Sequence, residues 1–281
     1  MTTPFGERVR AVLNERGPLC VGIDPHAALL DAWGLGQDAA GTREFGLRVV
    51  EATAGRAGVV KPQVSFFERF GSAGFAALED VLAAARAAGL VVIADAKRGD
   101  IGTTMDAYAS AWLAPGSAFE ADALTVNPFL GVGALDGTFD LAQAHGKGVF
   151  VLAATSNPEA EPLQRSQSET GRSVSADIVS VVSARNAERG RTGEWGSIGF
   201  VIGATVDWTD AGLAAFSPAA PILAPGFGAQ GASPADLHRR FGSMSPAVIA
   251  SESRSILTAG PHGLADAIEA RVAEYREVSR G

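Results

Sequence analysis

The charged residues best suited to chemistry lie at the ends of three apolar runs early in the chain. Asp24 ends the first run, Lys61 ends the second, and Asp95 and Lys97 end the third, with Asp100 just beyond. Side chains two residues apart in a strand share a face, so Asp95 and Lys97 are expected to project together. Buried charges must be paired or functional because desolvation is costly, and shifted pKa values in such clusters suit acid–base chemistry. The pattern favours a catalytic site over a ring of structural salt bridges.

A second group of residues is suited to holding a phosphate. The glycine-rich segment 226–231 contains Gln230 and follows the seventh apolar run, and Arg254 ends the eighth. Glycines let backbone N–H groups approach phosphate oxygens, and an arginine can bind them through two hydrogen bonds. We therefore expect an anion site here, the alternative being a surface turn beside an exposed arginine.

Other motifs in the chain carry less weight. Segment 226–231 also matches the dinucleotide-binding pattern G-x-G-x-x-G, with Glu252 further on as the expected acid. That fold needs several more strand–helix units after the motif, and only one strand and one helix remain, so we reject it. The histidines show no metal-ligand spacing, and no H-E-x-x-H, C-x-x-C or G-x-S-x-G motif occurs. We assign His26 a structural role, and the aromatic cluster of Phe66, Phe67 and Phe70 to the core or a dimer surface.

Eight short apolar runs must position these residues. Their near-continuous apolarity is typical of parallel strands covered on both faces, and helical patterns with apolar steps of three and four lie between them. Eight alternations predict an α/β fold, a single-domain (β/α)8 TIM barrel over residues 1–281, with a doubly wound open sheet as the alternative. The runs are 19–25, 58–63, 90–96, 121–128, 148–155, 198–205, 221–226 and 247–254. The helical patterns are 75–85, 105–112, 135–142, 174–185, 233–241 and 264–275.

The barrel would bring the charged residues together. Active sites of such barrels lie at the carboxyl ends of the strands. Consecutive strands are expected to be neighbours about 4.8 Å apart, so the charges that end the first three strands would form one cluster. Residues 156–173 are polar and lack periodicity, which predicts an extended, mobile loop after the fifth strand.

Composition limits the class of protein. The 281 residues are 47% hydrophobic and 19% charged, which supports a sizeable core and argues against extensive disorder. The net charge of −8 argues against binding to nucleic acid. No apolar run approaches the ~18 residues of a membrane span, and the start Met-Thr-Thr-Pro-Phe lacks a signal-peptide pattern. The single cysteine, Cys20, allows no intramolecular disulfide and is expected to be a core residue of a cytoplasmic protein.

Several segments resemble one known family. Residues 95–104, Asp-Ala-Lys-Arg-Gly-Asp-Ile-Gly-Thr-Thr, resemble the D-x-K-x-x-D-I-x-x-T motif of orotidine 5'-phosphate decarboxylases. Residues 21–25, 155–158 and 225–231 are similar to other motifs of that family, and residues 61–68 resemble its longer-chain, type 2 subfamily. One departure stands at the phosphate site, where the family often has Gly-Arg-Ser and this chain has Ser253-Arg254-Ser255.

The resemblance implies a cofactor-free and metal-free barrel enzyme. It would decarboxylate orotidine 5'-phosphate (OMP) to UMP, the last step of UMP biosynthesis, with Lys97 protonating C6. It would be an obligate homodimer in which Asp100, Ile101 and Thr104 reach the neighbouring subunit's site. The implied catalytic residues are Lys61, Asp95, Lys97 and Asp100. The implied substrate-binding residues are Asp24 for the ribose, Ser156 for the pyrimidine, Gln230 and Arg254 for the phosphate, and Ile101 and Thr104 from the partner.

Alternative functions stay open at this point. The closest is a Mg2+-dependent sugar-phosphate enzyme, a 3-keto-gulonate 6-phosphate decarboxylase or a hexulose-phosphate synthase, which resembles this barrel and its Asp-x-Lys-x-x-Asp strand. Lys61 favours the nucleotide enzyme, because a metal site prefers an acidic residue there. A Schiff-base aldolase and a non-catalytic phosphate-binding barrel are weaker alternatives. The alternating charges argue against the last.

Overall fold

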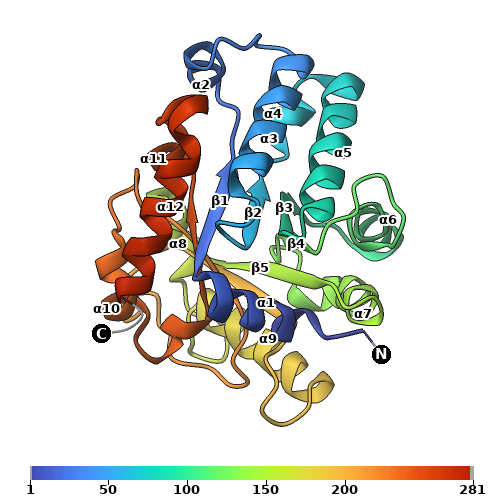
Figure 1. Cartoon of the computed structure of the whole chain (residues 1–281). Helices are drawn as coiled ribbons and strands as arrows, with labels where there is room; N and C mark the ends of the chain where they lie inside the picture. The colour runs from blue at the N-terminus through green and yellow to red at the C-terminus, as the bar shows by residue number, and fades with distance from the viewer. Residues whose placement is uncertain (1, 279–281) are drawn as a thin grey trace.

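Each of the eight apolar runs forms a strand, and the strands close into a parallel barrel (Figure 1). The structure is a computed structural model, and it describes residues 2–278. Every strand pairs with its neighbours in the chain, and β8 closes on β1. The strands are β1 Leu19–Ile23, β2 Val59–Pro62, β3 Val91–Arg98, β4 Ala123–Val126, β5 Gly148–Ala154, β6 Ile198–Ile202, β7 Ile222–Pro225 and β8 Val248–Glu252. The predicted TIM barrel is confirmed, and the open sheet is excluded.

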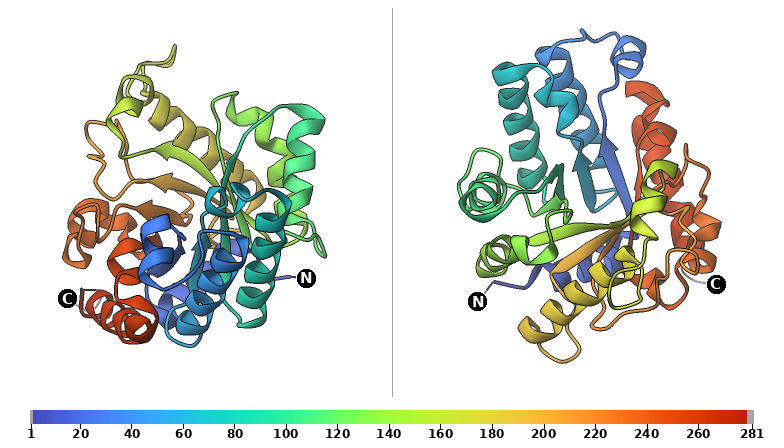
Figure 2. Two further views of the ribbon diagram at one scale, coloured as in Figure 1. Left: turned by 90° about the horizontal axis from the view of Figure 1, so that it is seen from above. Right: turned by 180° about the vertical axis from the view of Figure 1, so that it is seen from behind.

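Helices cover the outside of the barrel (Figure 2). All six helical patterns found in the sequence are confirmed as helical segments, whereas other helices, the longest of them over residues 5–16 and 39–53, were not predicted. The α-helices are α1 Phe5–Arg16, α2 Ala27–Ala32, α3 Ala39–Thr53, α4 Ser65–Glu68, α5 Gly71–Ala87, α6 Gly102–Leu113, α7 Asp136–Ala144, α8 Glu161–Gln164, α9 Val174–Arg189, α10 Leu237–Phe241, α11 Arg254–Leu257 and α12 Gly260–Val278. The 3-10 turns are η1 Val132–Leu135, η2 Pro158–Ala160, η3 Pro234–Asp236 and η4 Gly242–Ala247.

The alternation of strand and helix fails once. No helix forms between β6 and β7, so the prediction of eight complete alternations is wrong at this position. Segment 203–221 contains Pro218 and Pro221 as well as glycines, which disfavour a helix. Irregular chain covers the barrel here instead, and the ring of Phe216 packs 4.7 Å from that of Phe200, centroid to centroid.

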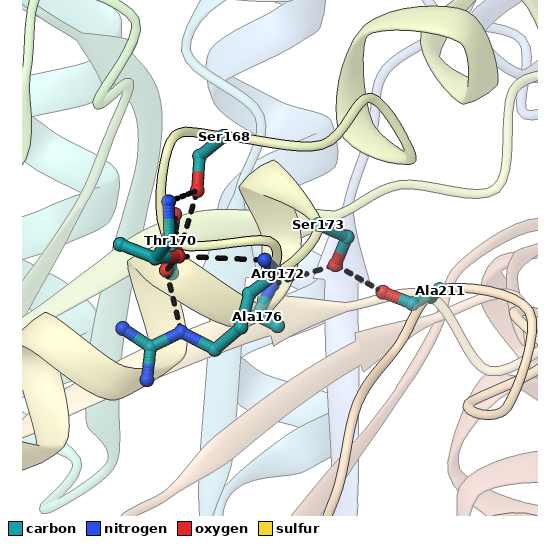
Figure 3. A network of polar contacts seen from close by, with 7 residues as sticks. Ser168, Thr170, Arg172, Ser173, Ala176 and Ala211 are labelled. Carbon is teal, nitrogen blue, oxygen red and sulfur yellow. Dashed lines mark hydrogen bonds and ion pairs between the residues drawn. The ribbon is translucent and has the colours of Figure 1, made fainter.

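The segment 156–173 also differs from the prediction of an extended loop, because η2 and α8 form within it. Its last residues are tied to α9, where the Arg172 guanidinium lies 2.7 Å from the Asp177 carboxylate. Ser173 caps α9 by accepting from the Ala176 N–H, and its hydroxyl donates to the Ala211 carbonyl at 2.6 Å (Figure 3). These bonds connect the end of the loop to the segment between β6 and β7. The mobility of the loop stays a prediction.

The interior of the barrel forms a core of its own. Inward side chains of the strands, Cys20 among them, pack with Phe5, Val9 and Leu13 of α1. The ring of Phe5 meets that of Phe150 edge-on at 5.9 Å, and no side chain could be built at Gly148 because Phe5 occupies the space. Helix α1 lies across the start of β1 and closes the amino-terminal end of the barrel (Figure 1). The other end is left open for a site.

The remaining helices pack on the outer face of the strands and bury most of the apolar side chains. The predicted single domain of residues 1–281 includes Met1 and residues 279–281, which lie outside the described residues. Within residues 2–278, no helix combines the length and apolarity required to cross a membrane.

Candidate active site

The carboxyl ends of the strands surround a cavity of about 560 Å³. Residues from the ends of β1, β2, β3, β5, β7 and β8 line it, so the closed barrel brings together positions far apart in the sequence. The predicted site residues that line this cavity are Asp24, Lys61, Asp95, Lys97, Ser156, Gln230 and Arg254.

Asp95 lies between two lysines at the bottom of the cavity. Its Oδ2 is 2.9 Å from the Lys61 Nζ, and its Oδ1 is 2.5 Å from the Lys97 Nζ. Lys61 and Asp95 are buried, whereas the Lys97 side chain is 46% exposed. The carboxylate therefore holds one buried ammonium and one that faces the open cavity.

Lys61 and Asp95 each shift the pKa of the other in the direction that keeps both side chains ionised. Burial raises the pKa of Asp95, but attraction to Lys61 and Lys97 outweighs it, and the pKa lies well below its usual range. Burial lowers the pKa of Lys61, but attraction to Asp95 and Asp24 outweighs it, and the pKa lies above its usual range. The pair should therefore stabilise the fold fully between the unfolded-state pKa values, about 4 for Asp and about 10 for Lys. That contribution is lost below pH ~4, as the pH falls towards the lower folded-state pKa of Asp95.

The backbone of β3 is irregular where these residues lie. Among the described residues, Lys97 is the one non-glycine residue with positive φ, at 49°. Its N–H donates to the Thr125 Oγ1 at 2.9 Å, and the Thr125 hydroxyl donates to the Asp95 Oδ1 at 2.9 Å. The sequence analysis missed Thr125. The signal that could have found it is a hydroxyl within the apolar run of β4, two residues before Asn127.

Two polar atoms of the cavity wall have no partner. The Asp24 Oδ1 and the Ser253 Oγ are buried and form no hydrogen bond with any described residue. Such groups are costly unless a ligand or water satisfies them. Ser253 stands where the resembling family often has glycine, so its hydroxyl is an extra polar group beside the predicted phosphate site.

The glycine-rich turn packs against the buried carboxylate of Glu252. The carboxylate of Glu252 is 3.0 Å from the Arg271 guanidinium and accepts from the Tyr275 hydroxyl at 2.8 Å. A side chain at Gly228, where φ is +71°, would meet Ser255 and the Glu252 carboxylate, so only glycine lets the turn lie this close. Glu252, the acid of the rejected dinucleotide-binding pattern, thus supports the turn from beneath.

The strand-5 end is held by a side chain of α8. The Thr155 N–H donates to the Gln164 Oε1 at 2.9 Å, and the Gln164 amide donates to the Thr155 hydroxyl at 3.0 Å. Ser156 follows directly and lines the cavity. The short helix α8, which the sequence analysis did not predict, therefore fixes the residue before Ser156.

Two residues assigned to structural roles also lie at the cavity. His26 and Phe66 both line it, with ring centroids 4.3 Å apart. Phe67 is fully buried, as predicted for a core residue. Phe66, in α4, lines the cavity and is not a core residue, whereas its alternative role at a dimer surface stays a prediction.

Three predicted site residues are not brought into the cavity of this chain. Asp100, Ile101 and Thr104 lie outside it, at the start of α6, and Ile101 is 62% exposed. The Asp100 carboxylate accepts from the Ile101 N–H at 2.8 Å. The charged cluster within one chain is therefore Asp24, Lys61, Asp95 and Lys97.

Charges at the opposite end of the barrel are paired with one another. There Lys147 lies 2.8 Å from Glu120, and Arg8 pairs with Asp122.

Among the described residues, no three His, Cys, Asp or Glu side chains gather in a way that could hold a metal ion.

Comparison with known proteins finds similarity over nearly the whole chain. The family described as Orotidine 5'-phosphate decarboxylase / HUMPS family matches residues 17–265. An orotidine 5'-phosphate decarboxylase from Salinispora tropica is 53% identical over 257 residues, or 92% of this chain and 91% of the relative. One from Streptomyces coelicolor is 52% identical over 260 residues, with the same two shares. A crystal structure from Streptomyces avermitilis, assigned as an orotidine 5'-phosphate decarboxylase, has a TM-score of 0.94 at 47% identity and covers 100% of this chain and 97% of its own.

Proposed function

The chain belongs to the orotidine 5'-phosphate decarboxylase / HUMPS family, and from this we propose that it decarboxylates OMP to UMP and CO2, the last step of UMP biosynthesis. The observation that carries the proposal is the Lys97 ammonium, which faces the cavity and is held by the ionised Asp95. Relatives that are 50% or more identical bear the name of this enzyme. The magnesium-dependent sugar-phosphate reaction is the alternative within the same family.

The reaction needs a cation beside one carbon of the pyrimidine. When the bond between C6 and the carboxylate breaks, CO2 leaves and the electron pair stays on C6, which has no electron sink. The Lys97 ammonium stabilises that charge and then gives C6 a proton. Asp95 holds the Lys97 ammonium in place, and Lys61 balances the charge of Asp95 from the buried side.

The rest of the cavity is proposed to hold the nucleotide. The unpartnered Oδ1 of Asp24 accepts a ribose hydroxyl, and Ser156 contacts the pyrimidine. Gln230 and Arg254, with the glycine-rich turn, bind the 5'-phosphate. Binding energy from the phosphate, remote from C6, then contributes to the transition state.

Replacing Arg254 with alanine should weaken phosphate binding. Loss of a charge-assisted contact costs about 1.5–3 kcal/mol, so KM for OMP should rise roughly 10- to 100-fold, with a smaller fall in kcat. Steady-state kinetics with OMP measures both. Arg43→Ala, which removes an exposed arginine paired with Asp80, is the matched control and should leave both constants unchanged. If Arg254→Ala had the wild-type KM for OMP, Arg254 would not bind the phosphate.

We also propose that the protein is a cytoplasmic homodimer with shared sites. Exposed apolar side chains follow the neighbouring strands β3 and β4: Ile101 is 62%, Phe129 73% and Leu130 53% exposed. Covering such a patch with a second copy would bury apolar area and carry Asp100 towards the partner's cavity. The buried thiol of Cys20 suits a reducing compartment.

Mixing two inactive variants tests the shared site. Lys97→Ala and Asp100→Ala should each be inactive as homodimers. In a hybrid dimer one site carries both substitutions and the other carries neither. Subunit exchange at equal concentrations should therefore restore about a quarter of wild-type activity. Activity that stays absent although mass spectrometry detects hybrids would place Asp100 in the same site as Lys97 of its own chain.

The proposed reaction is tested by following the absorbance of OMP with purified protein and EDTA. Conversion to UMP that does not depend on a metal ion would support the proposal. A folded protein that leaves OMP intact would contradict it. In that case, turnover of sugar phosphates on addition of Mg2+ would support the alternative.

A further inference from the structure

The register between β3 and β4 changes where the charged residues lie. Ala94 pairs with Leu124, and the next pair is Arg98 with Val126, so β3 advances four residues while β4 advances two. The extra residues of β3 are a bulge, which leaves backbone groups without their usual ladder partners. Asp95 and Lys97 both lie within this bulge.

Thr125 of β4 lies opposite the bulge and replaces the missing ladder contact. Its Oγ1 accepts from the Lys97 N–H at 2.9 Å, where a regular strand would offer a carbonyl. The same hydroxyl donates to the Asp95 Oδ1 at 2.9 Å. A hydroxyl can accept and donate at once, which neither a methyl nor an ammonium group can do. Thr125 is fully buried, so its hydroxyl does not exchange either partner for solvent.

These two bonds fix the backbone of Lys97 and the carboxylate of Asp95, which together orient the Lys97 ammonium. A non-glycine residue with φ of 49° is strained and persists only where its surroundings hold it. Thr125 holds the backbone of Lys97 and also the carboxylate that binds the Nζ of Lys97. Branching at Cβ restricts the Thr125 side chain to few rotamers, which suits this role.

We propose that Thr125 is a positioning residue for proton transfer from Lys97, an inference that rests on the proposed decarboxylation. Without the hydroxyl, the Asp95 carboxylate and the Lys97 backbone each lose one anchor, and the ammonium spends less time where C6 needs it. The effect falls on kcat rather than on nucleotide binding, because Thr125 does not line the cavity.

Two substitutions separate this role from simple packing. Thr125→Val keeps the branched shape and removes the hydroxyl, whereas Thr125→Ser keeps the hydroxyl and removes a methyl group. A positioning role predicts that Val is impaired and Ser is not. A packing role predicts the reverse order. Thr138→Val is the matched control, because Thr138 is also fully buried but its hydroxyl has no partner among the described residues.

The experiment is steady-state kinetics of the wild type and the three variants with OMP, beside UMP binding by calorimetry. We expect Thr125→Val to lower kcat roughly 10- to 100-fold, with KM for OMP and Kd for UMP within about threefold of wild type. Thr125→Ser and Thr138→Val should stay within about threefold of wild-type kcat. Wild-type kcat in Thr125→Val, an equal loss in Val and Ser, or a loss confined to KM would each overturn the role of Thr125 while the proposed function stands. A wild-type protein that binds UMP but leaves OMP intact would overturn both.

Discussion

Replacing Lys97 with alanine is expected to lower kcat for OMP by at least about four orders of magnitude. General-acid catalysis contributes about 10²- to 10⁴-fold, and a preorganised charge at the reacting atom about 10²- to 10³-fold. The Lys97 ammonium is proposed to supply both, because it faces the cavity while its partner Asp95 lies beneath it. Single-turnover and steady-state assays with OMP, in the presence of EDTA, measure the loss.

Lys97→Arg separates the two contributions. Arginine keeps the positive charge but does not lose a proton in proteins, so it should stabilise the developing charge without protonating C6. We expect its kcat to lie between those of wild type and Lys97→Ala. Both variants should unfold at nearly the wild-type temperature, because Lys61 still neutralises Asp95. A folded Lys97→Ala enzyme that retains a tenth of wild-type activity would show that another group donates the proton.

Replacing Asp95 with asparagine is expected to damage both stability and catalysis. The substitution keeps the shape but leaves the buried ammonium of Lys61 without its 2.9 Å partner. Breaking a buried ion pair by removing one partner costs about 3–5 kcal/mol. The Lys97 Nζ loses its contact as well, so kcat should fall by about 10³-fold. Urea unfolding at pH 7 and OMP turnover measure the two effects.

A double variant separates the loss of stability caused by the unpaired charge of Lys61 from the loss of activity caused by the absence of Asp95. Lys61→Met combined with Asp95→Asn removes both charges and replaces the lysine with an apolar side chain of similar length. It should regain much of the lost free energy of unfolding, because a buried pair can be replaced by apolar groups at little cost. It should not regain activity. Equal stability of Asp95→Asn and wild type would mean that Asp24 alone can balance Lys61.

The charged cluster of the site can be predicted from the sequence, because short segments of the chain carry the patterns that identify it. Near-continuous apolar runs identify parallel strands, and the last polar residue of each run marks the carboxyl end. Short right-handed connections make consecutive strands neighbours, so Asp24, Lys61 and Asp95 had to meet at one mouth. The resemblance of residues 95–104 to the orotidine 5'-phosphate decarboxylase motif then predicted which reaction these residues carry out.

Contacts between distant positions were decided only by the tertiary structure. The expectation that Asp95 and Lys97 project together assumed a regular strand, yet the structure joins them through a bulge with positive φ at Lys97. The bulge depends on the register against β4, and Thr125 acquires its role from that register alone.

The tertiary structure also decided the role of Glu252, which an ion pair with α12 fixes beneath the glycine-rich turn. It likewise decided that irregular chain, not a helix, connects β6 to β7. Periodicity reports which face of an element is apolar. It does not report which residues of separate elements meet, because packing and register set those distances once the barrel closes.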